Sequence, residues 1–229
     1  MFAHYNQCVK RPSYNFVMGA TLLVVYELTL AIFPTGTANG VDVLFQSFLK
    51  LIPFSTLIIS VLLIVTGIYV VYNDRKEGFE LRGNIMTLMF LEATFWAFFV
   101  LFTVPMLVGK LLLQQIGVQS LNFFQKIGFS CGAGFYEEFF FRLLLVRGLQ
   151  VFLQTKGWES RNIMIILMGA FLFSIAHYIG DYGDVFTMNS FLQRFFFGLF
   201  MNFLFVTRGF GITACTHALY DVIVFNLQS

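Results

Sequence analysis

Long runs of mostly apolar residues constrain the fold more than any other feature of this chain. A helix needs about 17–25 such residues to cross a bilayer, and only helices or closed barrels satisfy their backbone groups there. Hydrophobic residues make up 58% of the 229 positions and charged residues only 11%. We therefore expect an all-α, polytopic membrane helix bundle with about seven transmembrane helices, near residues 15–34, 52–72, 85–108, 127–153, 162–180, 191–207 and 210–227.

The chain divides near residue 126 into a part without assignable motifs and a part that carries several. Residues 1–126 are expected to form N-terminal transmembrane helices and an interfacial segment, and residues 127–229 a separate core. Segment 109–126 mixes Leu, Gln and Lys, which favours an amphipathic helix along the membrane surface. The first apolar run is long and lacks a clear small-residue cleavage site, so we expect a retained anchor.

The placement of basic residues predicts an orientation, because cytoplasmic segments carry an excess of Lys and Arg. With a cytoplasmic N-terminus, the inside segments hold Lys10, Arg11, Arg75, Lys76, Arg82, Arg147, Lys156, Arg161 and Arg208. The outside segments then hold Lys50, Lys110, Lys126 and Arg194. We expect an integral, multi-pass protein of the cell (inner) membrane. The sequence shows no basic patch typical of nucleic-acid binding.

Three ionisable residues interrupt the fourth apolar run, in the hexamer from Glu137 to Arg142. Each such group costs about 2.5–3.5 kcal/mol at the centre of a membrane helix, so it is rarely there without a role. Glu138 and Arg142 stand four residues apart and can pair on one helical face. Glu137 points about 100° away. We expect one carboxylate to hold structure and the other to be kept for chemistry.

Two later apolar runs also contain polar residues. Phe173-Ser174-Ile175-Ala176-His177 closes the fifth run, before Gly180-Asp181-Tyr182-Gly183-Asp184. In the seventh run, His217 and Asp221 stand one helical turn apart. Polar residues can serve only as hydrogen-bonding contacts between membrane helices. Two histidines, two glutamates, an aspartate and an arginine within the last hundred residues favour a functional site instead.

Together these residues resemble the three-motif signature of the CAAX-protease and bacteriocin-processing family (CPBP, also called ABI). The motifs are Glu137-Glu138-x-x-x-Arg142, Phe173-x-x-x-His177 and His217-x-x-x-Asp221. The resemblance covers about residues 127–227 and implies a catalytic core of intramembrane glutamic-type endopeptidases, a family that includes the enzyme that trims prenylated CAAX proteins. Residues 1–126 carry no motif of this kind.

The resemblance implies a role for each matching residue. Glu137 would be the base that activates water, assisted by His177, and His217 with the residue at 221 would stabilise the oxyanion. The third motif often ends in Asn, whereas this chain has Asp221. An ionised carboxylate cannot donate a hydrogen bond to an oxyanion. We expect Asp221 either to be protonated or, preferably, to accept a proton from His217 and fix its tautomer.

The first motif supplies two further residues with a different role. The resemblance implies that Glu138 and Arg142 hold the fourth helix and the substrate in place. The peptide or protein substrate is not specified: a prenylated or other lipidated tail, a leader peptide, a C-terminal sorting tail and a membrane regulator all fit. Membrane lipids are the other expected partner.

Alternative chemistries use the same residues or their neighbours. Zinc could take Glu137, His177 and His217 as ligands, although we expect no cofactor. A serine mechanism would need Ser174, whose position three residues before His177 gives no nucleophile arrangement by default. Thiol nucleophiles at Cys131 or Cys215 compete with a simple packing role, which we favour.

Two alternatives are not enzymes. The same polar cleft could bind a peptide in a catalytically silent scaffold or bacteriocin-immunity protein, but such a protein is expected to lose the base or its histidine. A proton-coupled transporter would also use Glu and His, yet the sequence shows no inverted repeat.

The depth of the site follows from where His177 stands in its run. It lies about three residues from the Gly180 end and about fifteen from the Arg161 end, or roughly 5 Å and 22 Å along a helix. The predicted orientation therefore places the site in the outer half of the bilayer, with substrates cut near their extracytoplasmic end.

Overall fold

The structure is a computed structural model that describes residues 2–33, 55–109, 121–154, 160–179 and 183–227. Within these ranges the regular elements are all helices, which confirms the expected all-α class. They are α1 (Phe2–Cys8), α2 (Pro12–Ile32), α4 (Ser55–Lys76), α5 (Gly83–Val108), α6 (Phe123–Glu138), the π-helix η2 (Phe139–Arg147), α7 (Gly148–Phe152), α8 (Ser160–Ala176), α9 (Met188–Arg208) and α10 (Phe210–Leu227).

Four helices are long and apolar enough to cross a membrane: α2, α5, α9 and α10. Helix α8 is apolar but has only 17 residues. Each of the seven predicted runs coincides with a helix in the described part of the chain, and the fourth is the unbroken series α6, η2 and α7. The helices support an integral membrane protein, while the number of seven spans stays a prediction.

Helix α6 begins earlier than the predicted fourth run. It starts at Phe123, four residues before residue 127, so its first turn overlaps the predicted interfacial segment 109–126. The Asn122 side chain accepts a hydrogen bond from the Gln125 backbone and the Gln125 side chain accepts one from the Asn122 backbone, a capping box that starts a helix. Lys126 is consequently buried, and its Nζ donates to the Phe225 carbonyl 2.9 Å away. Residues 110–120 of that segment lie outside the described residues.

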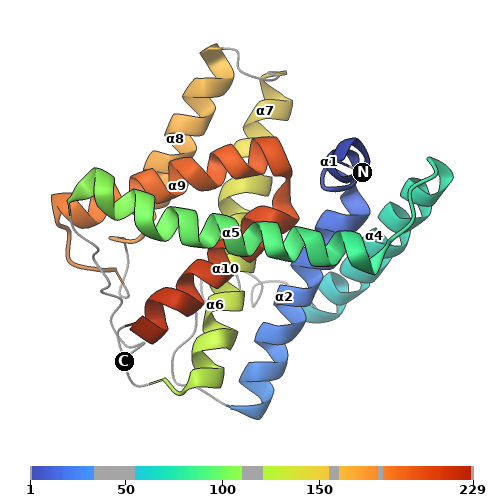
Figure 1. Cartoon of the computed structure of the whole chain (residues 1–229), viewed down its shortest axis with the longest axis horizontal. Helices are drawn as coiled ribbons and strands as arrows, with labels where there is room; N and C mark the ends of the chain where they lie inside the picture. Colours follow the sequence, from blue (N-terminus) through green and yellow to red (C-terminus); the bar gives the residue numbers. More distant parts are fainter. Residues whose placement is uncertain (1, 34–54, 110–120, 155–159, 180–182, 228–229) are drawn as a thin grey trace.

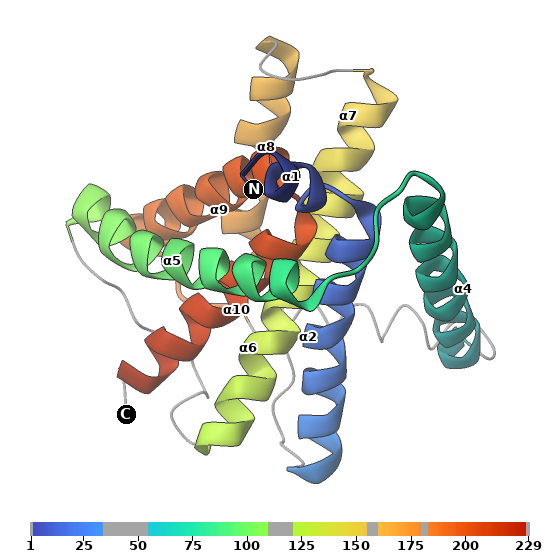
Figure 2. The same cartoon turned by 45° about the vertical axis from the view of Figure 1, so that its right-hand side comes forward.

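The helices pack around α10, which contacts α6, α2, α5 and α9 (Figure 1). Helices α2 and α6 run side by side, and α4 stands at the outer edge next to α2 (Figure 2). Helix α8 packs along α9 and against η2. The helices that carry the three motifs, α6–η2, α8 and α10, thus meet in the interior of the bundle.

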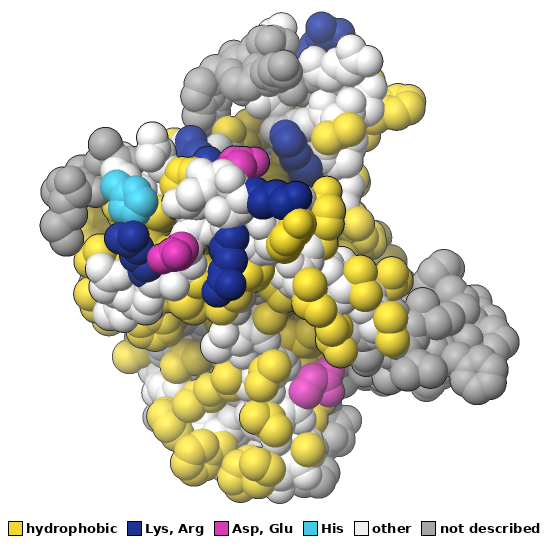
Figure 3. All heavy atoms as spheres, turned by 90° about the vertical axis from the view of Figure 1, so that its right-hand side faces the viewer, with side chains coloured by type: hydrophobic (Ala, Val, Ile, Leu, Met, Phe, Trp, Pro, Cys, Tyr) yellow, Lys and Arg dark blue, Asp and Glu magenta, His cyan; other side chains and the backbone are white. Residues whose placement is uncertain are grey.

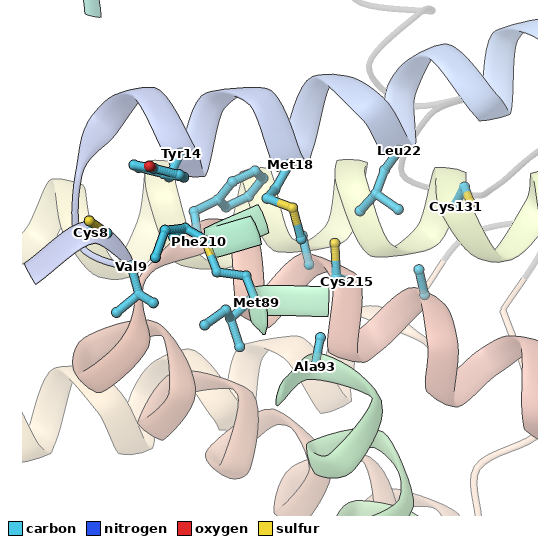
Figure 4. Packing of buried hydrophobic residues seen from close by; sticks show 14 of the residues in the cluster. Cys8, Val9, Tyr14, Met18, Leu22, Met89, Ala93, Cys131, Phe210 and Cys215 are labelled. Carbon is cyan, nitrogen blue, oxygen red and sulfur yellow. The ribbon is translucent and has the colours of Figure 1, made fainter. Parts of the chain in front are cut away.

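A hydrophobic cluster joins both parts of the chain (Figure 4). It takes Tyr14 and Met18 from α2, Met89 from α5, and many side chains from α6 and α10. All three cysteines are free thiols buried in this cluster: Cys8, Cys131 and Cys215. Their surroundings confirm the packing role that the sequence favoured.

A glycine on α6 brings the motif helices close together. A Cβ atom at Gly134 would lie 2.7 Å from the Ala214 carbonyl oxygen and 2.8 Å from the Ala218 Cβ, both on α10. Real Cβ atoms do not approach other atoms this closely, so only glycine permits the observed spacing. The next turn of α6 carries Glu137 and Glu138, which therefore lie directly beside α10.

Candidate active site

The first motif lies where α6 changes into a π-helix. Glu137 and Glu138 are the last two residues of α6, and η2 begins at Phe139. π-Helical turns within α-helices are frequent at functional sites. Glu138 and Arg142 are both fully buried, and Arg142 Nε lies 2.9 Å from Glu138 Oε2, a close ion pair whose angle falls outside hydrogen-bond geometry. The structure contains the pair that the four-residue spacing predicted.

The other oxygen of Glu138 contacts the third motif. His217 Nδ1 lies 2.6 Å from Glu138 Oε1, a short hydrogen bond between α10 and α6. Asp221 Oδ2 lies 3.5 Å from the opposite ring nitrogen, Nε2. The sequence favours Asp221 as the residue that orients His217, but the direct contact in the structure is from Nδ1 to Glu138. The reason is the close packing at Gly134, which no spacing within α10 reveals.

Glu137 faces both histidines. Its Oε2 lies 3.8 Å from His177 Nε2 and 3.9 Å from His217 Nε2. These distances are too long for direct hydrogen bonds and short enough for one water molecule to contact all three groups. The Glu137 side chain is largely buried. The structure thus brings together the four predicted residues Glu137, His177, His217 and Asp221.

The tautomer of His177 follows from its own backbone. His177 comes directly after α8, and its Nδ1 lies 2.8 Å from the Phe173 carbonyl oxygen. A carbonyl oxygen only accepts, so Nδ1 carries a proton. In the neutral ring, Nε2 is then an acceptor directed toward Glu137.

Two phenylalanines hold the imidazole rings. The Phe173 ring lies 4.8 Å from the His177 ring, and the Phe197 ring lies 4.9 Å from the His217 ring, both edge to face. Arg142 also lies over Phe173, 4.5 Å from the ring centroid. The sequence analysis missed Phe197, because it is one of 32 phenylalanines and α9 carries no polar motif. In the structure its neighbour Gly198 packs closely on the Phe173 ring, where a Cβ would lie 3.0 Å away, but a glycine gives no signal of this contact in the sequence.

The connection from α8 to α9 is fastened near His177. The Asp184 backbone N–H donates to the His177 carbonyl at 2.8 Å, and the Asp184 side chain pairs with Arg194 on α9. Tyr178 and Ser190 share a hydrogen bond of 2.7 Å. The distribution of basic residues along the sequence gives Arg194 no role beyond its place in an outside segment. Residues 180–182 of this connection lie outside the described residues.

The serine alternative receives no geometric support in the described part of the chain. Ser174 Oγ is buried and donates to the Phe191 carbonyl at 2.8 Å, so its hydroxyl hydrogen is directed at a backbone oxygen and not at a catalytic base. Among the described residues, no group of three His, Cys, Asp or Glu side chains is arranged to hold a metal ion.

The comparison with protein families identifies the part of the chain that carries this site. Residues 119–223 match the family described as type II CAAX prenyl endopeptidase Rce1-like. The match agrees with the resemblance that the three motifs carried, and it supports a membrane peptidase of the CAAX protease type. Comparison with curated proteins and with solved structures gives no significant match.

Proposed function

We propose that this protein is an intramembrane endopeptidase in which Glu137 activates a water molecule. The observation that supports this most is the position of Glu137 Oε2, at 3.8 and 3.9 Å from two imidazole nitrogens. A buried carboxylate and two histidines converge at distances that one water molecule can bridge. Peptide hydrolysis needs a base for water and donors for the oxyanion, and this arrangement supplies both.

The first step is the attack of water on the scissile carbonyl carbon. The water donates one hydrogen to His177 Nε2, whose acceptor state follows from the bond of Nδ1 to Phe173. It transfers the other proton to Glu137 Oε2 as the new C–O bond forms. The water oxygen then keeps a lone pair directed at the substrate.

The second step is collapse of the tetrahedral intermediate. His217 stabilises the oxyanion only if both its ring nitrogens carry protons, with Nδ1–H donating to Glu138 and Nε2–H to the oxyanion. The proton held by Glu137 passes to the leaving amine as the peptide C–N bond breaks. Glu137 returns to its ionised state, so the reaction consumes one water molecule and needs no metal ion. Metal content and activity in chelator, measured together, test that last point.

Glu138 and Arg142 act as positioning residues in this scheme. Glu138 accepts from His217 through one oxygen and pairs with Arg142 through the other. Arg142 Nη2 also lies 3.4 Å from the Gly198 carbonyl, which ties η2 to α9. Loss of either residue would move His217 without touching the attacking water.

The substrate is a peptide or protein segment at or in the membrane, and we propose a multi-pass location in the inner membrane. A comparison of protein termini between cells with wild-type protein and cells with Glu137→Gln identifies it. We expect at least one cleaved membrane-associated peptide to disappear in Glu137→Gln. Glu27→Gln, an exposed glutamate of α2, is the matched control and should leave the cleavage unchanged.

Products that end in a trimmed prenylated tail would identify a CAAX protein as the substrate. Products that have lost a C-terminal sorting tail would identify an exported protein with such a tail. Persistence of every cleavage in Glu137→Gln, with a partner still bound, would contradict the enzyme and favour the scaffold alternative.

The side of access is a separate part of the proposal. His177 and Arg161 lie sixteen residues apart along and just beyond α8, about 24 Å. With Arg161 on the cytoplasmic side, the site opens toward the outer half of the bilayer. Gly183→Cys should react with an impermeant thiol reagent on intact cells, and Arg75→Cys only after lysis, because the native cysteines are buried. The reverse pattern would place the site on the cytoplasmic side.

A further inference from the structure

A pocket of about 330 Å³ lies away from the candidate active site. Its lining consists of Lys10, Arg147, Gln150, Asn162, Phe205, Val206 and Gly209. The pocket is therefore formed where η2 and α7 meet α8, between the chain that precedes α2 and the junction of α9 with α10. Arg147 is ten residues beyond Glu137, at most about 15 Å along the helix. No residue of the catalytic group lines it, so the pocket does not depend on the proposed function.

The charges of the lining favour an anion. Lys10 and Arg147 are exposed, and neither pairs with a carboxylate in the described part of the chain, while the lining contains no Asp or Glu. Their neighbours behave differently: Arg11 pairs with Glu77, and Arg208 pairs with Glu92. Two cations thus face one pocket without a protein counter-charge among the described residues.

Two buried amides add polar groups to the same pocket. Gln150 Nε2 donates to Asn162 Oδ1 at 2.8 Å, and both side chains are more than nine-tenths buried. Burial of polar side chains in apolar helices costs free energy, so such residues often mark a functional site. Helices α8 and α10 begin beside the pocket, and their N-termini favour an anion. Helices α7 and α9 end there, and their C-termini disfavour one, so the helix dipoles give no net preference. The preference for an anion therefore rests on the side chains.

The apolar surroundings of the pocket favour a lipid over a soluble anion as its ligand. Phe205 and Val206 form an apolar part of the lining. On two of the helices that line the pocket, Phe152 at the end of α7 and Met164 on α8 are 81% and 68% exposed, as expected for side chains that face acyl chains. Figure 3 shows basic side chains gathered in the upper half of one face of the molecule, above a lower half covered by apolar side chains. Basic pockets between membrane helices at such a boundary bind lipid head groups.

We propose that this pocket binds the phosphate group of an anionic membrane lipid, with Lys10 and Arg147 as the charged contacts and Gln150 and Asn162 as polar contacts. The head group occupies the basic end of the pocket, and an acyl chain leaves along Phe205 and the exposed surface of α7 and α8. The volume lies in the range of small-molecule sites.

The test is lipid binding by the full chain in detergent, followed by native mass spectrometry and by melting temperature. The probes are dihexanoyl phosphatidylglycerol, dihexanoyl phosphatidylcholine and inorganic phosphate. The double variant K10Q/R147Q should lose about ten- to thirtyfold in affinity for phosphatidylglycerol, the effect of two basic groups near an anionic lipid. The matched control R75Q/K76Q removes the same charge from exposed positions on α4 and should lose less than about threefold.

Each outcome decides the proposal. Tighter binding of phosphatidylglycerol than of the other two probes, lost in K10Q/R147Q and retained in the control and in Arg147→Lys, supports it. Equal binding of inorganic phosphate would replace the lipid with a soluble anion and overturn the proposal as stated. Equal losses in both double variants, or no loss in either, would show that only the general charge of the protein attracts lipid.

Discussion

The half-buried carboxylate of Glu92 and the buried carboxylate of Glu137 both lie on helices of the bundle, and their surroundings differ. Glu92 on α5 has both oxygens occupied: Oε1 accepts from Arg208 Nε at 2.5 Å and Trp96 Nε1 at 3.0 Å, and Oε2 accepts from Arg208 Nη2 at 2.7 Å and Tyr5 at 2.6 Å. Burial and the bond to Glu92 raise the pKa of Tyr5, which keeps its hydroxyl protonated as a donor. This cluster fastens α1, α5 and α9 together.

Glu137 has the contrasting environment. Its Oε2 lies 3.8 and 3.9 Å from its two imidazole neighbours, distances that leave place for a reacting water molecule. Glu138, one residue further, resembles Glu92, since one oxygen accepts from His217 and the other pairs with Arg142. Glu92 and Glu138 thus join helices through direct contacts, whereas Glu137 Oε2 also faces two imidazole nitrogens at distances that a water molecule can bridge.

After replacement of Glu137 itself, the largest effect is expected at His217, which contacts Glu138 directly and also faces Glu137. His217→Ala should lower the cleavage rate by about 10²–10³, the usual loss for one oxyanion donor. It also leaves Glu138 Oε1 without its partner, at a cost of about 1–3 kcal/mol in unfolding free energy. Rate and melting temperature measured on one preparation check both. A loss of stability with an unchanged rate would assign His217 to structure alone.

Much of this arrangement was predictable from the sequence, but not the contacts between helices. The four-residue spacing predicted the pair of Glu138 and Arg142, and the three motifs predicted which residues gather. The bond from Glu138 to His217 was missed, because it depends on how closely α6 approaches α10. The same limit hid Phe197: interhelical packing is decided by small residues such as Gly134 and Gly198, which carry no chemical signature.

The second prediction tests that close approach. Gly134→Ala places a Cβ at 2.7 Å from the Ala214 carbonyl, and we expect a loss of about 1–3 kcal/mol from overpacking, with a lower cleavage rate as Glu138 moves from His217. Gly148→Ala is the control, because a Cβ there meets nothing within 4 Å. It should be neutral or stabilising by up to about 1 kcal/mol. Similar melting temperatures for both variants would refute the packing account.

The smallest effect is expected at Asp221. Since Glu138 already orients the His217 ring through Nδ1, Asp221→Asn should change the rate by less than about tenfold and leave the melting temperature within a few degrees. Asn also restores the residue that often ends the third motif. A loss of about 10⁴ in rate, the size seen when a triad carboxylate is replaced by an amide, would return the tautomer role to Asp221.

The central claim is tested most directly by exchanging the two carboxylates for amides in parallel. Both variants, Glu137→Gln and Glu92→Gln, replace a carboxylate by an amide. For each variant we would measure the melting temperature and the rate at which it cleaves the substrate identified by the comparison of protein termini. We expect Glu137→Gln to lose cleavage by about 10⁴, the upper end for a general base, with its melting temperature unchanged. Glu92→Gln should melt about 5–10 °C lower, the result of losing charge-assisted bonds, and keep cleaving below that temperature. Full cleavage by Glu137→Gln would contradict the account.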